Sequence, residues 1–241
     1  RSVSRGLGDV YKRQVWPWLA DRHGLIAAVD APHAAHPERF NFGELAERIA
    51  TAAAAFRRHG VKEGDVVALF AENSPRWLVA DQGLMRAGAA DAVRGASAPV
   101  EELRYILSDC QATALVVQNA EVWRRLALPP DQRAQLRFVL QLEGEPAEGA
   151  MGWEAFLASG AGLDPVCPAG GRDTVATVLY TSGTTGQPKG VPLTHANLLH
   201  QMSSLACVAY PEPGAPVLSV LPIWHAYERS ASYFFLSCAC T

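Results

Sequence analysis

Short apolar runs alternate along this chain with segments of helical periodicity, and this alternation constrains the fold more than any other feature. The clearest run is 65–70, where apolar residues occupy consecutive rather than alternate positions. Such a strand is typical of a parallel sheet that is covered on both faces. The alternation therefore predicts an α/β fold with layered, mostly parallel sheets and flanking helices.

Local signals mark where individual helices begin and end. Asn41 and Glu44 have the spacing of a capping box, and apolar residues then recur at helical spacing until Gly60. Ser74 and Pro75 are typical of the start of a second helix. We expect further helices at 101–108, 122–126, about 196–208 and from Tyr227 onward, and further strands at 113–117, 138–142, 174–180 and 217–221.

Composition excludes several classes of protein. The chain has 241 residues, of which 49% are hydrophobic and 19% charged, as in ordinary globular proteins. Its 21 Lys and Arg against 24 Asp and Glu leave a net charge of −3, so we expect no nucleic acid partner. Five cysteines without a CxxC pair indicate neither a disulfide framework nor a zinc site, which favours the cytoplasm. No apolar run approaches the roughly 18 residues of a membrane span.

The two ends of the sequence differ from the rest. Residues 4–14, SRGLGDVYKRQ, look like a translated sequencing adapter, so we treat 1–14 as a non-native tail. At the other end, the chain stops at Thr241 inside an apolar segment without a helix or strand stop signal. We therefore expect 15–241 to be one incomplete domain.

The most informative motif is the loop 180–190, YTSGTTGQPKG, which directly follows an expected strand. Its glycines let the backbone approach a ligand closely, and its hydroxyl and N–H groups are donors for phosphate oxygens. Lys189 adds a positive charge suited to a polyphosphate. Because α/β folds bind ligands at the carboxyl ends of their strands, the motif predicts a polyphosphate site.

Two better-known phosphate-binding motifs do not fit this loop. A Walker A loop that started at Gly183 would need glycine at the position of Pro188, and the GxGxxG fingerprint of dinucleotide sites is absent. A surface loop without a ligand is the structural alternative. An eleven-residue pattern makes that alternative the weaker interpretation.

With its extension, YTSGTTGQPKGVPLTH, the loop resembles the phosphate-binding loop of the adenylate-forming (AMP-binding) enzymes, which include acyl-CoA synthetases, firefly-type luciferases and peptide-synthetase adenylation domains. Residues 72–92 and 221–230, the latter LPIWHAYERS, resemble the long-chain fatty acid CoA ligases, especially bacterial acyl-CoA or acyl-carrier-protein synthetases of cyanobacterial type. The resemblance covers about 40–241. It implies an incomplete large N-terminal domain of that fold, truncated at its C-terminus and without the small C-terminal domain.

The resemblance implies an acid–thiol ligase reaction. A fatty carboxylate attacks the α-phosphate of ATP to give an acyl-adenylate and pyrophosphate. The thiol of coenzyme A, or of the pantetheine of an acyl-carrier protein, then displaces AMP. Two alternatives stay open: a ligase for an aromatic or amino acid, and a non-catalytic nucleotide-binding module. The module predicts a stable folded monomer, whereas the ligase fragment predicts an exposed apolar face at 233–236.

The resemblance also assigns roles to individual residues. His225 is the expected catalytic residue, at the same sheet edge as the loop and beside the carboxylate and the α-phosphate, and Trp224 borders the acyl tunnel. The hydroxyl of Thr181 is the expected protein ligand of Mg²⁺. The residues expected to bind the β- and γ-phosphates are Thr181, Ser182, Gly183, Thr184, Thr185, Gly186 and Lys189.

Several other polar residues are expected to be structural. Those are His195 and Asn197 at a helix start, Asp81 in a solvated or locally hydrogen-bonded position, Glu228 paired with Arg229, and Cys238 and Cys240 in the core. The resemblance places further catalytic parts beyond Thr241, so we expect these 241 residues alone not to complete adenylation and a full-length parent to be active. A fatty substrate is compatible with peripheral membrane contact, although no basic amphipathic helix supports it.

Overall fold

The computed structural model describes residues 24–30, 38–181 and 187–241. In chain order, the elements are β1 (Ile26–Asp30), β2 (Glu38–Asn41), α3 (Phe42–Arg58), β3 (Val66–Phe70), α4 (Pro75–Arg86), β4 (Ala90–Arg94), α5 (Val100–Asp109), β5 (Ala114–Val117), α6 (Ala120–Leu126), α7 (Pro130–Gln135), β6 (Val139–Gln141), β7 (Met151–Gly152), α8 (Trp153–Gly160), β8 (Val175–Thr181), β9 (Lys189–Thr194), α9 (His195–Leu205) and α10 (Ala226–Ser237).

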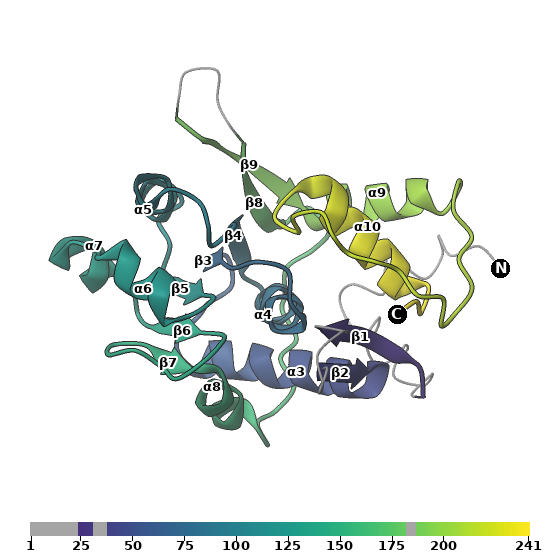
Figure 1. Cartoon of the computed structure of the whole chain (residues 1–241), viewed down its shortest axis with the longest axis horizontal. Coiled ribbons are helices and arrows are strands. Elements are labelled where there is room, and N and C mark those ends of the chain that lie inside the picture. The colour runs from purple at the N-terminus through teal and green to yellow at the C-terminus, as the bar shows by residue number, and fades with distance from the viewer. Residues whose placement is uncertain (1–23, 31–37, 182–186) are drawn as a thin grey trace.

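A seven-stranded sheet organises the molecule, with the strand order β7-β6-β5-β3-β4-β8-β9. Its neighbouring strands are parallel except for β9, which runs antiparallel to β8. Strands β1 and β2 form a separate antiparallel pair. Helices cover both faces of the large sheet (Figure 1). The predicted α/β class with mostly parallel pairing is confirmed.

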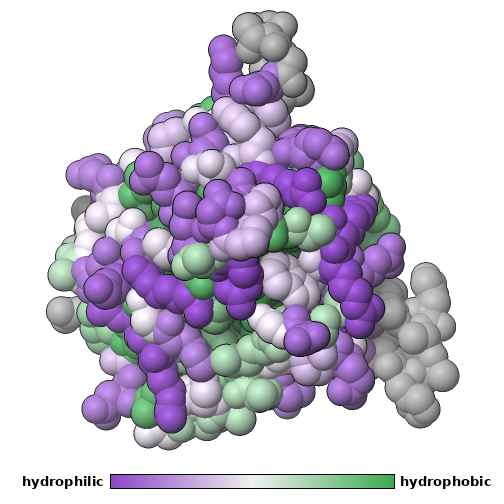
Figure 2. All heavy atoms as spheres, turned by 90° about the vertical axis from the view of Figure 1, so that its left-hand side faces the viewer, coloured by the Kyte–Doolittle hydropathy of each residue, from purple (hydrophilic) through white to green (hydrophobic). Residues whose placement is uncertain are grey.

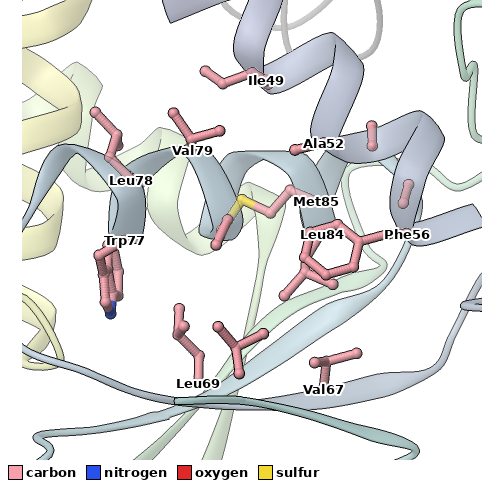
Figure 3. Packing of buried hydrophobic residues seen from close by; sticks show 14 of the residues in the cluster. Ile49, Ala52, Phe56, Val67, Leu69, Trp77, Leu78, Val79, Leu84 and Met85 are labelled. Carbon is pink, nitrogen blue, oxygen red and sulfur yellow. The ribbon is translucent and has the colours of Figure 1, made fainter. Parts of the chain in front are cut away.

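The continuous apolar run in β3 is explained by burial on both sides of the sheet. Val67 and Leu69 point into a core shared with α3, α4, α8, α9 and α10. Ala68 and Phe70 point into a second core beneath α5 and α6. Figure 3 shows Val67 and Leu69 facing Leu84 of α4 across the first core. Because successive side chains of a strand alternate between its faces, both sets must be apolar.

The capping signals in the sequence set the starts of two long helices. The Asn41 side chain accepts from the Glu44 N–H at 2.8 Å, and Glu44 accepts from the Asn41 N–H at 2.9 Å, which completes the predicted capping box. Ser74 accepts from the Trp77 N–H and opens α4, with Pro75 at its first turn. These bonds satisfy N–H groups that a helix start leaves without backbone partners.

A glycine explains how closely α3 and α4 pack. A Cβ atom added at Gly83 of α4 would lie 2.9 Å from Cβ of Ala52 on α3, closer than two carbon atoms tolerate. Both helices present small side chains at this contact, so their backbones approach each other and the first core is dense. None of the helices in the described part of the chain is long and apolar enough to cross a membrane.

Two expectations about the last part of the chain are wrong. Residues 217–221 form no strand: the Val217 N–H donates to the Thr241 carbonyl, but the segment joins no sheet ladder, and the side chain of Leu218 is 80% exposed. The apolar face expected to be exposed at 233–236 is largely buried, because α10 packs against α9 and shares the first core with α4.

Candidate functional site

The predicted phosphate loop connects the two strands of the β8–β9 hairpin. Thr181 and Lys189 are paired at the loop end of this hairpin, and both side chains are exposed. The strands reach beyond the rest of the surface in two views (Figures 1 and 2). Of the predicted phosphate-binding residues, Ser182, Gly183, Thr184, Thr185 and Gly186 lie outside the described residues. The structure therefore describes the two ends of the loop, where a hydroxyl and an ammonium group face solvent.

Tyr180, next to the loop, attaches the hairpin to α5 on the face of the sheet that carries the second core. The Tyr180 hydroxyl donates to Oδ2 of Asp109 on α5 at 2.6 Å. Its ring lies against Gly190 of β9, where an added Cβ would be 3.0 Å from the ring carbon Cζ. Burial, followed by the hydrogen bond to Asp109, raises the pKa of Tyr180 above its usual value, so this hydroxyl keeps its proton at neutral pH. The hairpin is thus attached to α5 directly below the loop.

Trp224 lies at the same edge of the sheet as the loop. Gly95 follows β4, and an added Cβ there would be 2.7 Å from the Trp224 ring. Strands β4 and β8 are parallel with Val93 opposite Leu179, so Gly95 and Thr181 each lie two residues beyond a paired position. The structure consequently brings Trp224 to the edge where Thr181 ends β8.

His225 follows Trp224 and is the residue that precedes α10. Its ring centroid lies 5.9 Å from that of Trp224, and its side chain is exposed. Its backbone carbonyl accepts from the Arg229 N–H at 3.2 Å, so its position is tied to the first turn of the helix. The sheet edge thus holds the ends of the predicted phosphate loop and the predicted catalytic histidine, whose roles stay predictions.

Asn73 holds the segment that leads to Trp224 in place. Its Nδ2 donates to the Leu221 carbonyl at 2.8 Å and to Oγ of Ser219 at 3.1 Å, and its Oδ1 accepts from the Ile223 N–H at 2.9 Å. The segment joins no ladder, so these bonds take the place of strand pairing. Sequence reasoning missed Asn73. The available signal was an amide side chain just beyond a buried strand, at the ligand-binding edge of an α/β sheet.

A buried charge network lies beneath this edge, and sequence reasoning also missed it. Arg229 of α10 is fully buried and forms ion pairs with Asp81 of α4 and with Asp91 of β4, the latter at 2.8 Å. It also donates from Nη1 to Oγ1 of Thr177 on β8 at 2.6 Å, and from Nε to the Tyr233 hydroxyl at 2.7 Å. That hydroxyl in turn donates to Asp81. The network joins α4, α10, β4 and β8.

Two carboxylates and one guanidinium share this interior. Burial raises the pKa of Asp91 to about 7, with Arg229 opposing the rise and Asp81 reinforcing it. Burial works against the charge of Arg229, but Asp81 and Asp91 outweigh burial and raise its pKa above the usual value. Arg229 therefore stays charged, while Asp91 takes up a proton near neutral pH, mainly because burial disfavours its charged form.

These contacts correct two predictions. Asp81 is fully buried rather than solvated; it accepts the local hydrogen bond that was the other expectation, from Gln82 at 2.9 Å, and is also paired with Arg229. Arg229 does not pair with Glu228, which instead accepts from Ser219 at 2.7 Å, because adjacent residues of a helix point in different directions. The signal for the network was an aspartate within each of two apolar segments, since a buried carboxylate needs a charged or hydrogen-bonding partner.

The remaining structural assignments agree with the sequence. Asn197 forms a capping box with Thr194 at the start of α9, and His195 is the first residue of that helix. Cys240 is buried and Cys238 is half-buried, and both thiols are free. In the described ranges, no cluster of three or more His, Cys, Asp or Glu side chains is arranged to hold a metal ion.

Comparison with known proteins gives the family. Residues 17–241 match the family described as AMP-binding enzyme. The probable acyl-activating enzyme 16 of Arabidopsis thaliana chloroplasts is 38% identical over 93% of this chain and 34% of its own length. The chloroplast long-chain-fatty-acid–[acyl-carrier-protein] ligase of the same plant is 38% identical over 93% of the chain and 33% of its own length. The chain therefore spans about a third of the length of these curated relatives.

A solved structure agrees with this match. A long-chain-fatty-acid–CoA ligase from Archaeoglobus fulgidus superposes with a TM-score of 0.80 and 26% sequence identity, over 96% of this chain and 45% of that one. By its family match, its relatives and its fold, this chain belongs to the AMP-binding enzymes.

Proposed function

We propose that this chain provides the ATP-binding edge of an enzyme that activates a long-chain fatty acid to an acyl-adenylate and then to a thioester. The observation that carries the proposal is the position of Thr181 and Lys189, exposed at the ends of the predicted phosphate loop, at the sheet edge that also holds Trp224. Relatives named as long-chain-fatty-acid ligases support the choice of substrate.

Each end of the loop supplies a group that the first step needs. When a carboxylate oxygen forms its bond to the α-phosphorus, the bond to pyrophosphate breaks and negative charge builds on the leaving group. The Lys189 ammonium attracts that charge, and the exposed Thr181 hydroxyl donates to a phosphate oxygen. His225, next to the ring of Trp224, orients the carboxylate and the α-phosphate. The predicted donors 182–186 complete the binding of the β- and γ-phosphates.

The chain fits a magnesium ion that arrives with the nucleotide. Mg²⁺ usually keeps several waters and binds through substrate phosphates with one or two protein oxygens. The exposed hydroxyl of Thr181 is such an oxygen, and the described residues offer no carboxylate cluster that would hold the ion without the nucleotide. When bound, Mg²⁺ would neutralise part of the triphosphate charge.

The second substrate is a thiol, from coenzyme A or from the pantetheine of an acyl-carrier protein. Relatives named for each acceptor occur among the similar proteins, so the proposal includes both. The cytoplasmic location and the peripheral membrane contact expected from the sequence stay predictions.

Fatty-acid-dependent exchange of labelled pyrophosphate into ATP by the full-length protein tests this proposal. We expect exchange with a C16 fatty acid and little with benzoate or with amino acids. His225→Ala should reduce the exchange rate by about 100-fold, the range of a lost catalytic group. His200→Ala, on the exposed side of α9, is the matched control and should leave the rate unchanged. Exchange only with an aromatic or amino acid, or ATP binding without any exchange, would overturn the assignment.

A further inference from the structure

We propose that Arg229 is a positioning residue that sets the geometry between His225 and the phosphate-binding hairpin. The inference rests on the proposed function. Arg229 contacts neither Thr181 nor Lys189. It acts through strands β4 and β8, whose carboxyl ends lie at the candidate site, and through α10, which begins there.

The first connection runs along α10. His225 immediately precedes this helix, and its carbonyl accepts from the N–H of Arg229 one turn later. One turn of an α-helix spans about 5.4 Å, so a side chain fixed at Arg229 fixes the start of the helix as well. The guanidinium therefore determines the position of His225, the residue just before the helix.

The second connection runs along the two strands beside it. Thr177, which accepts from Nη1 of Arg229, precedes Thr181 by four residues on β8. Asp91, which is paired in register with Thr177, precedes Gly95 by four residues at the end of β4. Arg229, Thr177 and Asp91 thus each lie four positions from a residue at the site edge, and the guanidinium joins α10 to β8 and to β4.

The chemistry of the network favours a geometric role over a contribution to stability. Replacing a whole buried ion-pair network with apolar side chains of similar volume is often neutral or stabilising, although removal of one partner alone is costly, so stability by itself does not require charged residues here. A guanidinium has a planar set of donors that fixes both distance and angle to its acceptors. Arg229 uses these donors on Thr177, Asp91 and Asp81, and so limits sliding and rotation of α10 against the sheet.

Thr177 gives the cleanest test, because its replacement keeps volume and burial. In the full-length protein, Thr177→Val removes the acceptor for Nη1, and Thr177→Ser keeps it. We expect Thr177→Val to lower kcat of fatty-acid-dependent pyrophosphate exchange about tenfold, with KM for ATP and for the fatty acid changed less than about threefold, since small misplacements of reacting groups are costly. Thr177→Ser should restore kcat to within about twofold of the wild type.

The control is Thr113→Val, which removes a comparable hydroxyl bond at the opposite edge of the sheet, where Thr113 donates to the Val66 carbonyl. It should leave kcat unchanged. All rates are measured well below the melting temperature, with folding verified by circular dichroism. Arg229→Lys, which keeps the charge and loses the planar donors, should lower kcat at least as much as Thr177→Val.

The outcomes separate this inference from the proposed function. A wild-type protein without exchange would contradict the proposed function. An active wild type in which folded Thr177→Val keeps full kcat would overturn the positioning role, and the same holds if Thr113→Val lowers kcat equally. Loss of kcat in Thr177→Val with rescue by Thr177→Ser supports it even where Arg229→Lys fails to fold.

Discussion

Thr177 and Thr181 lie four residues apart on the same strand, yet they belong to two very different regions of the molecule. Thr177 is fully buried and accepts a hydrogen bond from Arg229, in an interior where a guanidinium and two carboxylates contact one another. Thr181 is exposed and pairs through its backbone with Lys189, at the loop end of the hairpin. The comparison shows that the chain separates the groups that face a ligand from the groups that hold the site in shape.

The two regions also differ in how their charges are balanced. In the interior, Arg229 is the cation shared by two carboxylates, so its loss leaves negative charge in a place that water does not reach. At the hairpin, Lys189 is solvated and its loss costs the folded state little. Loss of Arg229 in the interior should therefore mainly lower stability, whereas loss of Lys189 at the hairpin should mainly weaken ligand binding. Experiments can contradict this expectation.

The largest expected effect is on stability, in the interior. Arg229→Met leaves Asp81 and Asp91 buried without their cation, so the free energy of unfolding should fall by about 4 kcal/mol. Arg104→Met is the matched control, because Arg104 donates to the carbonyls of Leu126 and Ala127 near the surface and forms no ion pair with another described residue, and it should cost about 1 kcal/mol. Urea denaturation measures both, and equal losses would remove the distinction between the regions.

The next effect is on ligand binding, at the hairpin. Lys189→Ala should raise the dissociation constant for ATP by 10- to 100-fold, since a hydrogen bond to a charged group contributes about 1.5–3 kcal/mol. The free energy of unfolding should change by less than about 0.5 kcal/mol, because the side chain is exposed. Lys62→Ala, exposed before β3 at the other edge of the sheet, is the control and should bind ATP normally. A large loss of stability in Lys189→Ala would contradict the comparison.

The sequence predicts the two regions unequally, and the reason is physical. The hairpin loop is a continuous motif of eleven residues, and its glycines, hydroxyls and lysine predict an anion site. The interior network combines residues from α4, β4, β8 and α10, and their contact depends on how those elements pack. Local patterns also predicted the parallel strands and the capped helices α3 and α4, because periodicity and capping act over a few residues.

Segment 217–221 shows where local patterns fail. Its apolar residues fit a strand, but a strand also needs a neighbour that offers backbone partners, and here Asn73 supplies hydrogen bonds from its side chain instead. The pairing of Glu228 with Arg229 failed for a related reason: two carboxylates from distant segments reach the arginine in the interior. Tertiary contacts, which no single segment encodes, decided both cases.

A smaller effect concerns pH, and it also belongs to the interior. Burial raises the pKa of Asp91 from 3.8 to about 7, so the folded state binds a proton that the unfolded chain releases. The resulting stabilisation is complete below about pH 4 and is lost as pH rises through 7, with a slope of up to about 1.4 kcal/mol per pH unit. Asp91→Asn cannot titrate, so between pH 5 and pH 8 the wild type should lose more stability than this variant. Parallel pH profiles from urea denaturation would refute the assignment.

The smallest effect lies between the two regions, at Tyr180. Its hydroxyl donates to Asp109, and Tyr180→Phe removes that bond while keeping the ring against Gly190. Asp109 is exposed and also accepts from Tyr105, so in this variant its carboxylate keeps a partner and contact with water. The free energy of unfolding should therefore fall by about 1 kcal/mol or less. Hydrogen exchange should nevertheless quicken in β8 and β9 while α10 stays protected. If α10 also loses protection, the hairpin and the buried network form one cooperative unit and the two regions are not independent.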